Sequence, residues 1–360
     1  MSDASLRATG TRLEHRLVRF DPSRIQWTDA VRSTIVLGVP IAYGLATGAP
    51  ATGVFLAIGC FNILLLQFSG TPADRLRLTG LGLLLNTAAI AAGTAVGSLG
   101  WIEVPLVAAG LVALHAANRI PRSWNLGFAA SAMYVIGVGL PGSSLPEALG
   151  RGELALVGGL IALLGLAAQP LVARGAGRPF PREDAPWPPV RQDGSLPEWM
   201  HALAVGLTAA LGLAIALALG LARDYWVMLT VVVVLRVHYE ETIVTGSARL
   251  IGTLAGAGVG AAIVLAPLPP LGPAILLLAF AFGAFALQRA NYLLYALALT
   301  AFVVLLLNLV YPEAASFAWV RVADTALGGA LAMMTGALLW YARYRPRGPG
   351  TDGGLFRDGA

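Results

Sequence analysis

Charged residues are scarce in this chain, making up 12% of its 360 residues, whereas hydrophobic residues make up 57%. So small a charged fraction excludes both an ordinary soluble domain and a disordered chain. Cysteine is nearly absent as well: Cys60 is the single one, so no internal disulfide can form. What remains is a polytopic membrane protein whose fold does not depend on disulfides.

Patterns that would indicate catalysis are also missing. The four histidines show no metal-ligand spacing, serines and carboxylates are scattered, and no glycine-rich phosphate loop follows a strand. There is no Walker-type nucleotide-binding motif, so active transport would have to draw on an ion gradient or a separate subunit. We therefore expect neither an enzyme nor a protein with a cofactor.

Apolar runs of about 20 residues, the length that crosses a bilayer as a helix, recur along the chain. The fourth and eighth runs are the shortest, and each could be tilted or partly re-entrant. The predicted spans are residues 31–47, 52–68, 78–98, 102–117, 124–140, 153–172, 200–221, 225–237, 248–266, 271–287, 292–310 and 317–341. The expected fold is an all-α polytopic membrane protein of about twelve transmembrane helices.

The spans divide into two groups of six. A cytoplasmic segment (1–29) precedes a first six-helix repeat (30–172), and a proline- and arginine-containing cytoplasmic linker (173–198) precedes a second repeat (199–342). The Gly- and Pro-rich tail (343–360) is expected to be disordered. Because six is even, both halves enter and leave the membrane on one side, so the repeats are predicted to be parallel.

Arginine placement predicts the orientation, since cytoplasmic loops collect positive charge. With both termini inside, 20 of the 24 basic residues fall on the cytoplasmic side. The formal net charge of +5 then reflects topology, and no nucleic-acid partner is needed to explain it. We expect a multi-pass protein of the bacterial plasma (inner) membrane.

Arginine and glycine residues recur in register between the halves. Arg77 and Gly80 return 172 residues later as Arg249 and Gly252, while Arg151 with Gly158 and Gly159 returns 170 residues later as Arg321 with Gly328 and Gly329. Duplicated halves commonly build a transport site between them, so paired arginines indicate an anion pathway. The alternative is a duplication whose arginines have only a structural role at the interface.

Two intramembrane charges break this symmetry, and such charges are functional candidates because they are costly in a bilayer. Arg32 lies in the first span, where the second half has Ala204. Asp324 follows Arg321 by three residues, where the first half has Leu154. Arg32 could instead extend to the inner headgroups, and Arg321 with Asp324 could be a structural ion pair.

Four motifs of the second half occur in a recognisable order. They are Asp224-Tyr225-Trp226 followed by Leu229-Thr230, then Arg249-x-x-Gly252-Thr253, then Asn291-Tyr292 with Thr300, then Arg321-x-x-Asp324-Thr325. Together they resemble the fusaric acid resistance protein-like family, within the aromatic acid exporter superfamily that includes plant aluminium-activated malate channels. The resemblance covers about residues 199–341 and is thinner in the first half. It implies export or conduction of organic anions, typically aromatic carboxylates, between two six-helix units.

These observations predict an inner-membrane exporter of small organic, aromatic carboxylate anions. The expected pathway residues are Arg77, Arg249, Arg32, Gly252, Thr253, Tyr225, Trp226 and Asn291, with Arg321 and Asp324 gating or coupling protons. The expected partners are the lipid bilayer, small organic anions, and a periplasmic adaptor or a second copy of the chain. A passive anion channel and a non-transporting scaffold or subunit of a larger assembly remain as alternatives.

Overall fold

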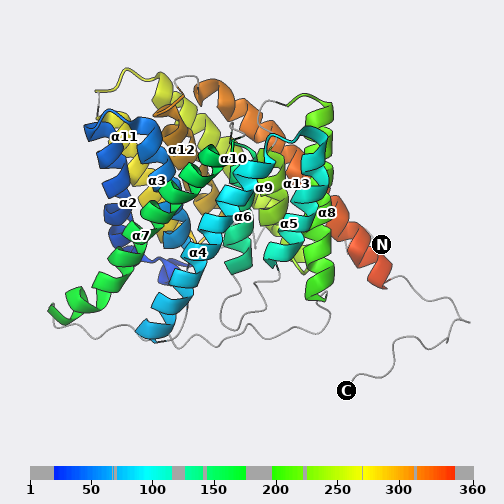
Figure 1. Cartoon of the computed structure of the whole chain (residues 1–360), viewed down its shortest axis with the longest axis horizontal. Helices are drawn as coiled ribbons and strands as arrows, with labels where there is room; N and C mark the ends of the chain where they lie inside the picture. Colours follow the sequence, from blue (N-terminus) through cyan, green and yellow to red (C-terminus); the bar gives the residue numbers. More distant parts are fainter. Residues whose placement is uncertain are drawn as a thin grey trace, which may run out of the picture.

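The computed structural model describes residues 20–66, 68, 71–115, 126–140, 144–175, 197–221, 225–269, 271–311 and 314–344. Within these ranges the chain forms α-helices and two short 3-10 helices, without a strand (Figure 1). The α-helices are α2 (Trp27–Ala46), α3 (Pro50–Leu65), α4 (Pro72–Val96), α5 (Glu103–His115), α6 (Leu126–Val138), α7 (Leu145–Gly175), α8 (Glu198–Ala218), α9 (Tyr225–Val234), α10 (Tyr239–Leu265), α11 (Gly272–Leu287), α12 (Tyr292–Asn308) and α13 (Ala314–Tyr344).

The prediction of an all-α chain is confirmed, and each predicted span overlaps one of these helices in order. Parts of the predicted terminal segments and linker, residues 1–19, 176–196 and 345–360, lie outside the described residues. Five helices are long and apolar enough to cross a membrane, namely α4, α7, α8, α10 and α13. The chain is thus a helical membrane protein, while the division into twelve full spans stays a prediction.

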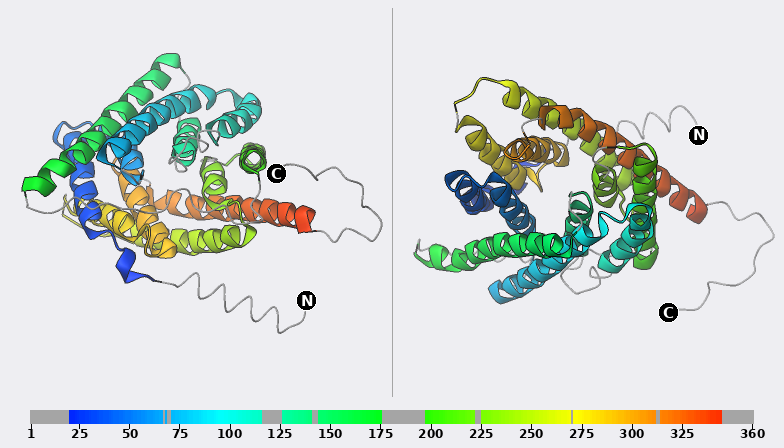
Figure 2. Two further views of the ribbon diagram at one scale, coloured as in Figure 1. Left: turned by 90° about the horizontal axis from the view of Figure 1, so that it is seen from below. Right: turned by 45° about the horizontal axis from the view of Figure 1, so that its top comes forward.

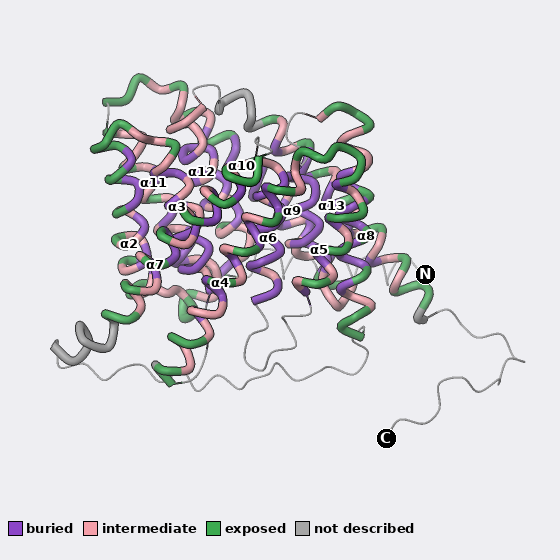
Figure 3. Tube along the Cα trace, viewed as in Figure 1, coloured by how far each residue is buried: buried purple, intermediate pink, exposed green. Residues whose placement is uncertain are grey.

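The shortest helix, α9, is also the most enclosed. Its ten residues extend about 15 Å, roughly half the hydrocarbon thickness of a bilayer. Nine of the ten are buried, and the helix packs against α6, α8, α10 and α13. A helix with apolar side chains on every face must lie inside a protein or a bilayer, and α9 lies inside the protein (Figure 3).

Helix ends repeat between the two halves. α2 and α8 are each followed by a left-handed glycine, Gly48 at φ +66° and Gly220 at φ +64°. In each half the amide of the next residue donates an equivalent backbone hydrogen bond: Ala49 to the Gly44 carbonyl, and Leu221 to the Ala216 carbonyl. Only glycine adopts this backbone without strain, so the sequence specifies the same helix stop twice.

Helix packing repeats in the same way. α4 packs against α6 and α7, and α10 packs against α12 and α13; α3 packs on α7, and α9 on α13. The two 31-residue helices, α7 and α13, run along opposite sides of the bundle (Figure 2). Within the described residues, the contacts among α3, α4, α6 and α7 therefore correspond to those among α9, α10, α12 and α13.

The two halves share their cores. One core cluster joins α4, α5 and α6 to α8 and α9, and the other joins α2 and α3 to α11 and α12. In the second cluster Phe61 of α3 lies 5.1 Å from the ring of Phe285 and 4.8 Å from the ring of Phe302. The halves therefore depend on each other for burial of apolar surface and do not form separate domains.

Candidate functional site

Charged side chains are buried at a few places in the described chain. Besides histidine, they are Glu103, Arg151, Arg249, Arg321 and Asp324, none more than 8% exposed. Burying a charge is costly unless a partner compensates it, so each of these positions needs a specific environment. Three of the five belong to α10 and α13 of the second half.

Arg321 stacks on an aromatic ring. Its guanidinium carbon Cζ lies 3.9 Å from the centroid of the Trp226 ring, and the Tyr225 ring lies 4.5 Å from that of Trp226. Arg321 also interacts electrostatically with Arg249, Tyr225 and Asp324. A guanidinium over an indole face is a favourable cation–π geometry that leaves the N–H groups at its edge free to point elsewhere.

The first half carries a weaker version of this contact. Arg151 of α7 lies 5.6 Å above the ring of Phe55 in α3 and pairs with Glu147, whose side chain is 40% exposed. Arg151 and Arg321 occupy matching positions along their helices. Arg151 comes six residues after the start of α7, and Arg321 comes seven residues after the start of α13. The duplicated arginine predicted from sequence is therefore a duplicated arginine–aromatic contact.

The glycines that follow Arg151 and Arg321 in the duplicated motif explain why α7 packs closely on α3 and α13 on α9. A Cβ atom on Gly158 would lie 2.0 Å from the Leu56 carbonyl oxygen, and one on Gly328 would lie 2.5 Å from the Val227 carbonyl oxygen. Both contacts are too short for any side chain, so α7 crosses α3, and α13 crosses α9, backbone to backbone. The aromatic residue beneath each arginine directly precedes the residue that the glycine contacts.

Arg249 brings a second positive charge to the same region. It is 4% exposed, and its Nε makes no hydrogen bond within the described chain. Three further buried atoms make no hydrogen bond within the described chain: Oγ1 of Thr253, Oγ1 of Thr300 and Nη1 of Arg321. Buried polar atoms normally have a partner, so a cluster of such atoms indicates a place for a polar ligand or water.

Two predicted pathway residues have structural tasks. A Cβ on Gly252 would lie 2.7 Å from the Leu293 carbonyl oxygen, so this glycine lets α10 pack closely on α12. Asn291 is the N-cap of α12, and its Oδ1 accepts a 2.9 Å hydrogen bond from the Leu294 amide. Asparagine at this position satisfies a helix-terminal N–H that would otherwise lack an acceptor.

Tyr225 connects the cluster to the first half. The position where a Cβ on Gly139 would lie is only 2.0 Å from the Tyr225 ring, so this ring packs directly on the backbone that follows α6. Tyr225 is 3% exposed. The cluster therefore lies where the second half meets the first, as expected for a site between duplicated halves.

The remaining predicted residues, Arg32 and Arg77, lie in different environments. Arg32 is partly buried, forms a 3.0 Å ion pair with Asp29 and interacts electrostatically with Arg75. Arg77 is exposed, five residues after α4 begins, whereas Arg249 is buried ten residues after α10 begins. The 172-residue offset therefore does not place Arg77 in an environment equivalent to that of Arg249.

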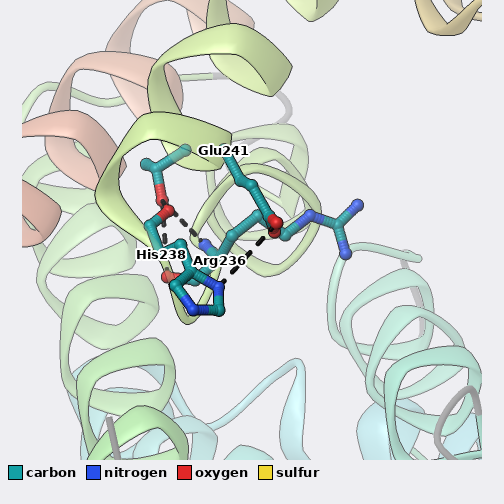
Figure 4. Close-up of polar contacts among 4 residues, drawn as sticks. Arg236, His238 and Glu241 are labelled. Carbon is teal, nitrogen blue, oxygen red and sulfur yellow. Dashed lines mark hydrogen bonds and ion pairs between the residues drawn. The ribbon is translucent and has the colours of Figure 1, made fainter. Parts of the chain in front are cut away.

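Sequence reasoning missed Arg236, in the turn between α9 and α10. Thr242 Oγ1 accepts a 2.9 Å hydrogen bond from the Arg236 amide, and His238, the N-cap of α10, lies 3.8 Å from Glu241 in the first turn of that helix (Figure 4). The Arg236 guanidinium points away from this turn and lies 5.8 Å from the ring centroid of Phe128 in α6. Arg236 and Arg249 both interact electrostatically with Tyr295. The signal in the sequence was an arginine two residues after the end of the apolar α9.

The cluster of Arg249, Arg321, Asp324, Tyr225 and Trp226 has a defined chemistry. Two arginines and one carboxylate give a formal charge of +1, which favours one monovalent anion. Guanidinium N–H groups match a carboxylate in a bidentate geometry, and the adjoining Tyr225 and Trp226 offer aromatic surface. We name these five residues the arginine–aromatic cluster.

Comparison with known proteins bears on this cluster. Residues 209–335, which contain all five of its members, match the family described as fusaric acid resistance protein-like. The inner membrane protein YccS of Escherichia coli (strain K12) is 33% identical over 141 residues, which are 39% of this chain and 19% of that protein. No solved structure matches the chain. The resemblance expected from the motifs is confirmed for this segment.

Proposed function

We propose that this chain, whose second half matches the fusaric acid resistance protein-like family, exports small organic carboxylate anions across the inner membrane. Aromatic carboxylates are the expected cargo. The observation that carries the proposal is the buried contact of Arg321 with Trp226, with Arg249 and Asp324 in electrostatic reach. The relative in Escherichia coli is an inner membrane protein, which supports the same location here.

The argument for an aromatic carboxylate combines charge and shape. A carboxylate entering the arginine–aromatic cluster meets the Nη1 of Arg321 and the Nε of Arg249, both buried without another hydrogen-bond acceptor. Charge-assisted hydrogen bonds of this kind contribute about 1.5–3 kcal/mol each. An aromatic ring on the same ligand packs against Tyr225 and Trp226 in an edge or offset geometry. An aliphatic acid gains the hydrogen bonds to the arginines but not the packing on the aromatic rings.

Asp324 is proposed to control release of the cargo. Its carboxylate is 1% exposed and acts on the same guanidinium that the cargo would bind, so the two compete for Arg321. A proton on Asp324 would remove this competition and favour cargo binding, and loss of that proton would restore the competition and favour release, so the protonation state of Asp324 would set the affinity for cargo. Normal transport by Asp324→Asn with an unchanged pH dependence would eliminate proton coupling at this residue.

The test is transport by the purified full chain in vesicles loaded with a panel of aromatic and aliphatic acids. We expect release of aromatic acids to depend on Arg321 and Arg249. Replacing both arginines by glutamine without loss of transport would refute an anion site here and favour a non-transporting scaffold. Large currents without a proton gradient would indicate a passive channel that uses the same arginines.

A further inference from the structure

Two lateral helix contacts join the halves, and their compositions differ. α2 packs on α11, where the ring of Trp27 lies 6.1 Å from that of Phe282. α5 packs on α8 in the equivalent place, and there the rings of His115 and His201 lie 5.8 Å apart. We call the second contact the α5–α8 seam. One seam is thus aromatic and apolar, while its counterpart contains two ionisable rings.

Hydrogen bonds fix the state of both rings. His115 is the last residue of α5, and its Nδ1 lies 3.0 Å from the Leu111 carbonyl oxygen and 3.2 Å from Ser131 Oγ. His201 Nε2 lies 3.1 Å from the Leu235 carbonyl oxygen at the end of α9. A carbonyl only accepts, so these nitrogens carry the protons of neutral rings. Each ring keeps one basic nitrogen, Nε2 in His115 and Nδ1 in His201.

The surroundings of the pair contain little charge to offset a proton. Arg236, in the α9–α10 turn, interacts electrostatically with His201. Glu198 lies one turn away on α8 and is exposed. The other ionisable residues of α5, α6 and α9 lie elsewhere: Glu103 lies at the opposite end of α5 from His115, the Tyr134 hydroxyl of α6 donates to the Leu106 carbonyl, and Tyr225 lies at the opposite end of α9 from Leu235. Protonating both rings would place two positive charges side by side and next to Arg236.

We propose that His115 and His201 form a proton-binding site in the α5–α8 seam, and that proton uptake there separates α5 from α8. The α2–α11 contact has no equivalent pair and stays closed, so the halves tilt about it. His201 is also hydrogen-bonded to the Leu235 carbonyl at the end of α9. The opposite end of α9 carries Trp226, so this helix links the seam to the arginine–aromatic cluster. The proposal concerns the contact between the halves and does not depend on the cargo.

The experiment measures the seam directly in the full chain. Spin labels at Ala113→Cys and Leu203→Cys, both exposed positions beside the two histidines, report the distance between α5 and α8 in a Cys60→Ala background. In lipid nanodiscs we expect the mean distance to increase by about 2 Å, with a broader distribution, on going from pH 8 to pH 5. His115→Gln combined with His201→Gln should keep the pH 8 distance at both pH values.

Two controls make the result specific. Labels at Val31→Cys and Ala279→Cys report the α2–α11 contact and should show no change with pH. His238→Gln changes a histidine of the α9–α10 turn, which lies outside the seam, and should leave the pH response intact. A distance that does not change in the parent, or a change that survives the double replacement, would overturn the proposal.

A measurement without histidine variants covers the case in which they misfold. Hydrogen exchange of the unaltered chain should show faster opening of α5 and α8 at pH 5 than at pH 8, after correction for intrinsic exchange rates. α2 and α11 should exchange alike at the two pH values. Equal protection of all four helices at both pH values would refute the proposed opening. Transport assays are not involved, so failure here and failure of the proposed export function are separate results.

Discussion

Single residues decide what the arginine–aromatic cluster can bind. Arg151 and Arg321 have matching positions in the repeat, yet they differ in how their charges are compensated. Arg151 pairs with a half-exposed carboxylate on its own helix, whereas Arg321 stacks on Trp226 and shares its surroundings with Arg249. This difference makes Arg151 a matched control for Arg321.

Replacing Arg321 by glutamine should weaken the apparent affinity for an aromatic carboxylate by about 10- to 100-fold. The loss corresponds to one charge-assisted hydrogen bond of about 1.5–3 kcal/mol. Initial rates of export from vesicles at several internal concentrations measure this change. Arg151→Gln should alter affinity less than about threefold, because Arg151 pairs with Glu147 of its own helix, whose side chain is 40% exposed, and a partly exposed ion pair contributes little. Equal losses in the two variants would contradict the assignment.

Replacing Trp226 by leucine should discriminate between cargo types. It removes the aromatic face beneath Arg321, at a cost of about 1–2 kcal/mol for a desolvated cation–π contact. We expect aromatic acids to lose about 5- to 30-fold in apparent affinity and aliphatic acids to lose less. Trp226→Phe retains a ring, so its apparent affinity for aromatic acids should lie between that of the parent and that of the leucine variant. Competition of unlabelled acids against one labelled acid provides the comparison.

At the scale of helices, glycines set the distances between elements. Gly158 and Gly328 make the same backbone crossing in the two halves, and Gly252 and Gly256 bring α10 against α12. The arginines lie at fixed steps from these crossings, so the glycines position the charges. Helix crossings of this kind depend on the absence of a side chain.

Gly328→Ala should destabilise the protein by about 1–3 kcal/mol, the usual cost of overpacking. The new methyl group would lie 2.5 Å from the Val227 carbonyl oxygen. Gly329→Ala is the matched control, since a Cβ there meets nothing within 4 Å and alanine favours the helix. Thermal denaturation in detergent should show a lower midpoint for the first variant alone. A similar midpoint for both would mean that the α9–α13 crossing is not close-packed.

Asn291→Ala tests whether this residue belongs to the pathway or to the helix end. Loss of the N-cap should cost about 1 kcal/mol of stability. Affinity for cargo should stay within about twofold, because Asn291 Oδ1 is used by the Leu294 amide. Asn291→Ser keeps a capping oxygen and should restore stability. A large loss of affinity with unchanged stability would place Asn291 in the pathway, as the sequence predicted.

At the scale of the whole molecule, the halves share their cores and meet along two seams of different composition. The cation–π pair of Arg236 with Phe128 and the packing of Tyr225 on Gly139 add contacts across the same boundary. The arginine–aromatic cluster lies beside this boundary. Relative movement of the halves would therefore change the surroundings of the cluster directly.

The predicted topology can be tested by cysteine labelling in a Cys60→Ala background. Leu219 and Leu265 are 66% and 76% exposed at helix ends that the arginine distribution assigns to the outside. Leu219→Cys and Leu265→Cys should react with an impermeant thiol reagent added to intact cells. Leu76→Cys, at an end assigned to the inside, should react only after the membrane is opened. The reverse pattern would invert the orientation.

The sequence by itself determined the helices. Apolar runs predicted twelve segments, and each corresponds to a helix, because hydropathy and glycine or proline stops act locally along the chain. The motif order likewise identified the segment of the family, since residue type and spacing are sequence properties. The predicted correspondence between Arg151 and Arg321 is also found in the structure, because both lie at similar positions along helices of equal length.

Only the tertiary structure decided which charges share an environment. Arg77 and Arg249 match in sequence, yet one is exposed and the other buried, because burial depends on the neighbouring helices. The partners of Arg321 come from α9 and α10, and those of His115 come from α6 and α8. Side chains far apart in the chain meet through packing and without any fixed spacing in the sequence, so no periodicity along the chain could have predicted these contacts.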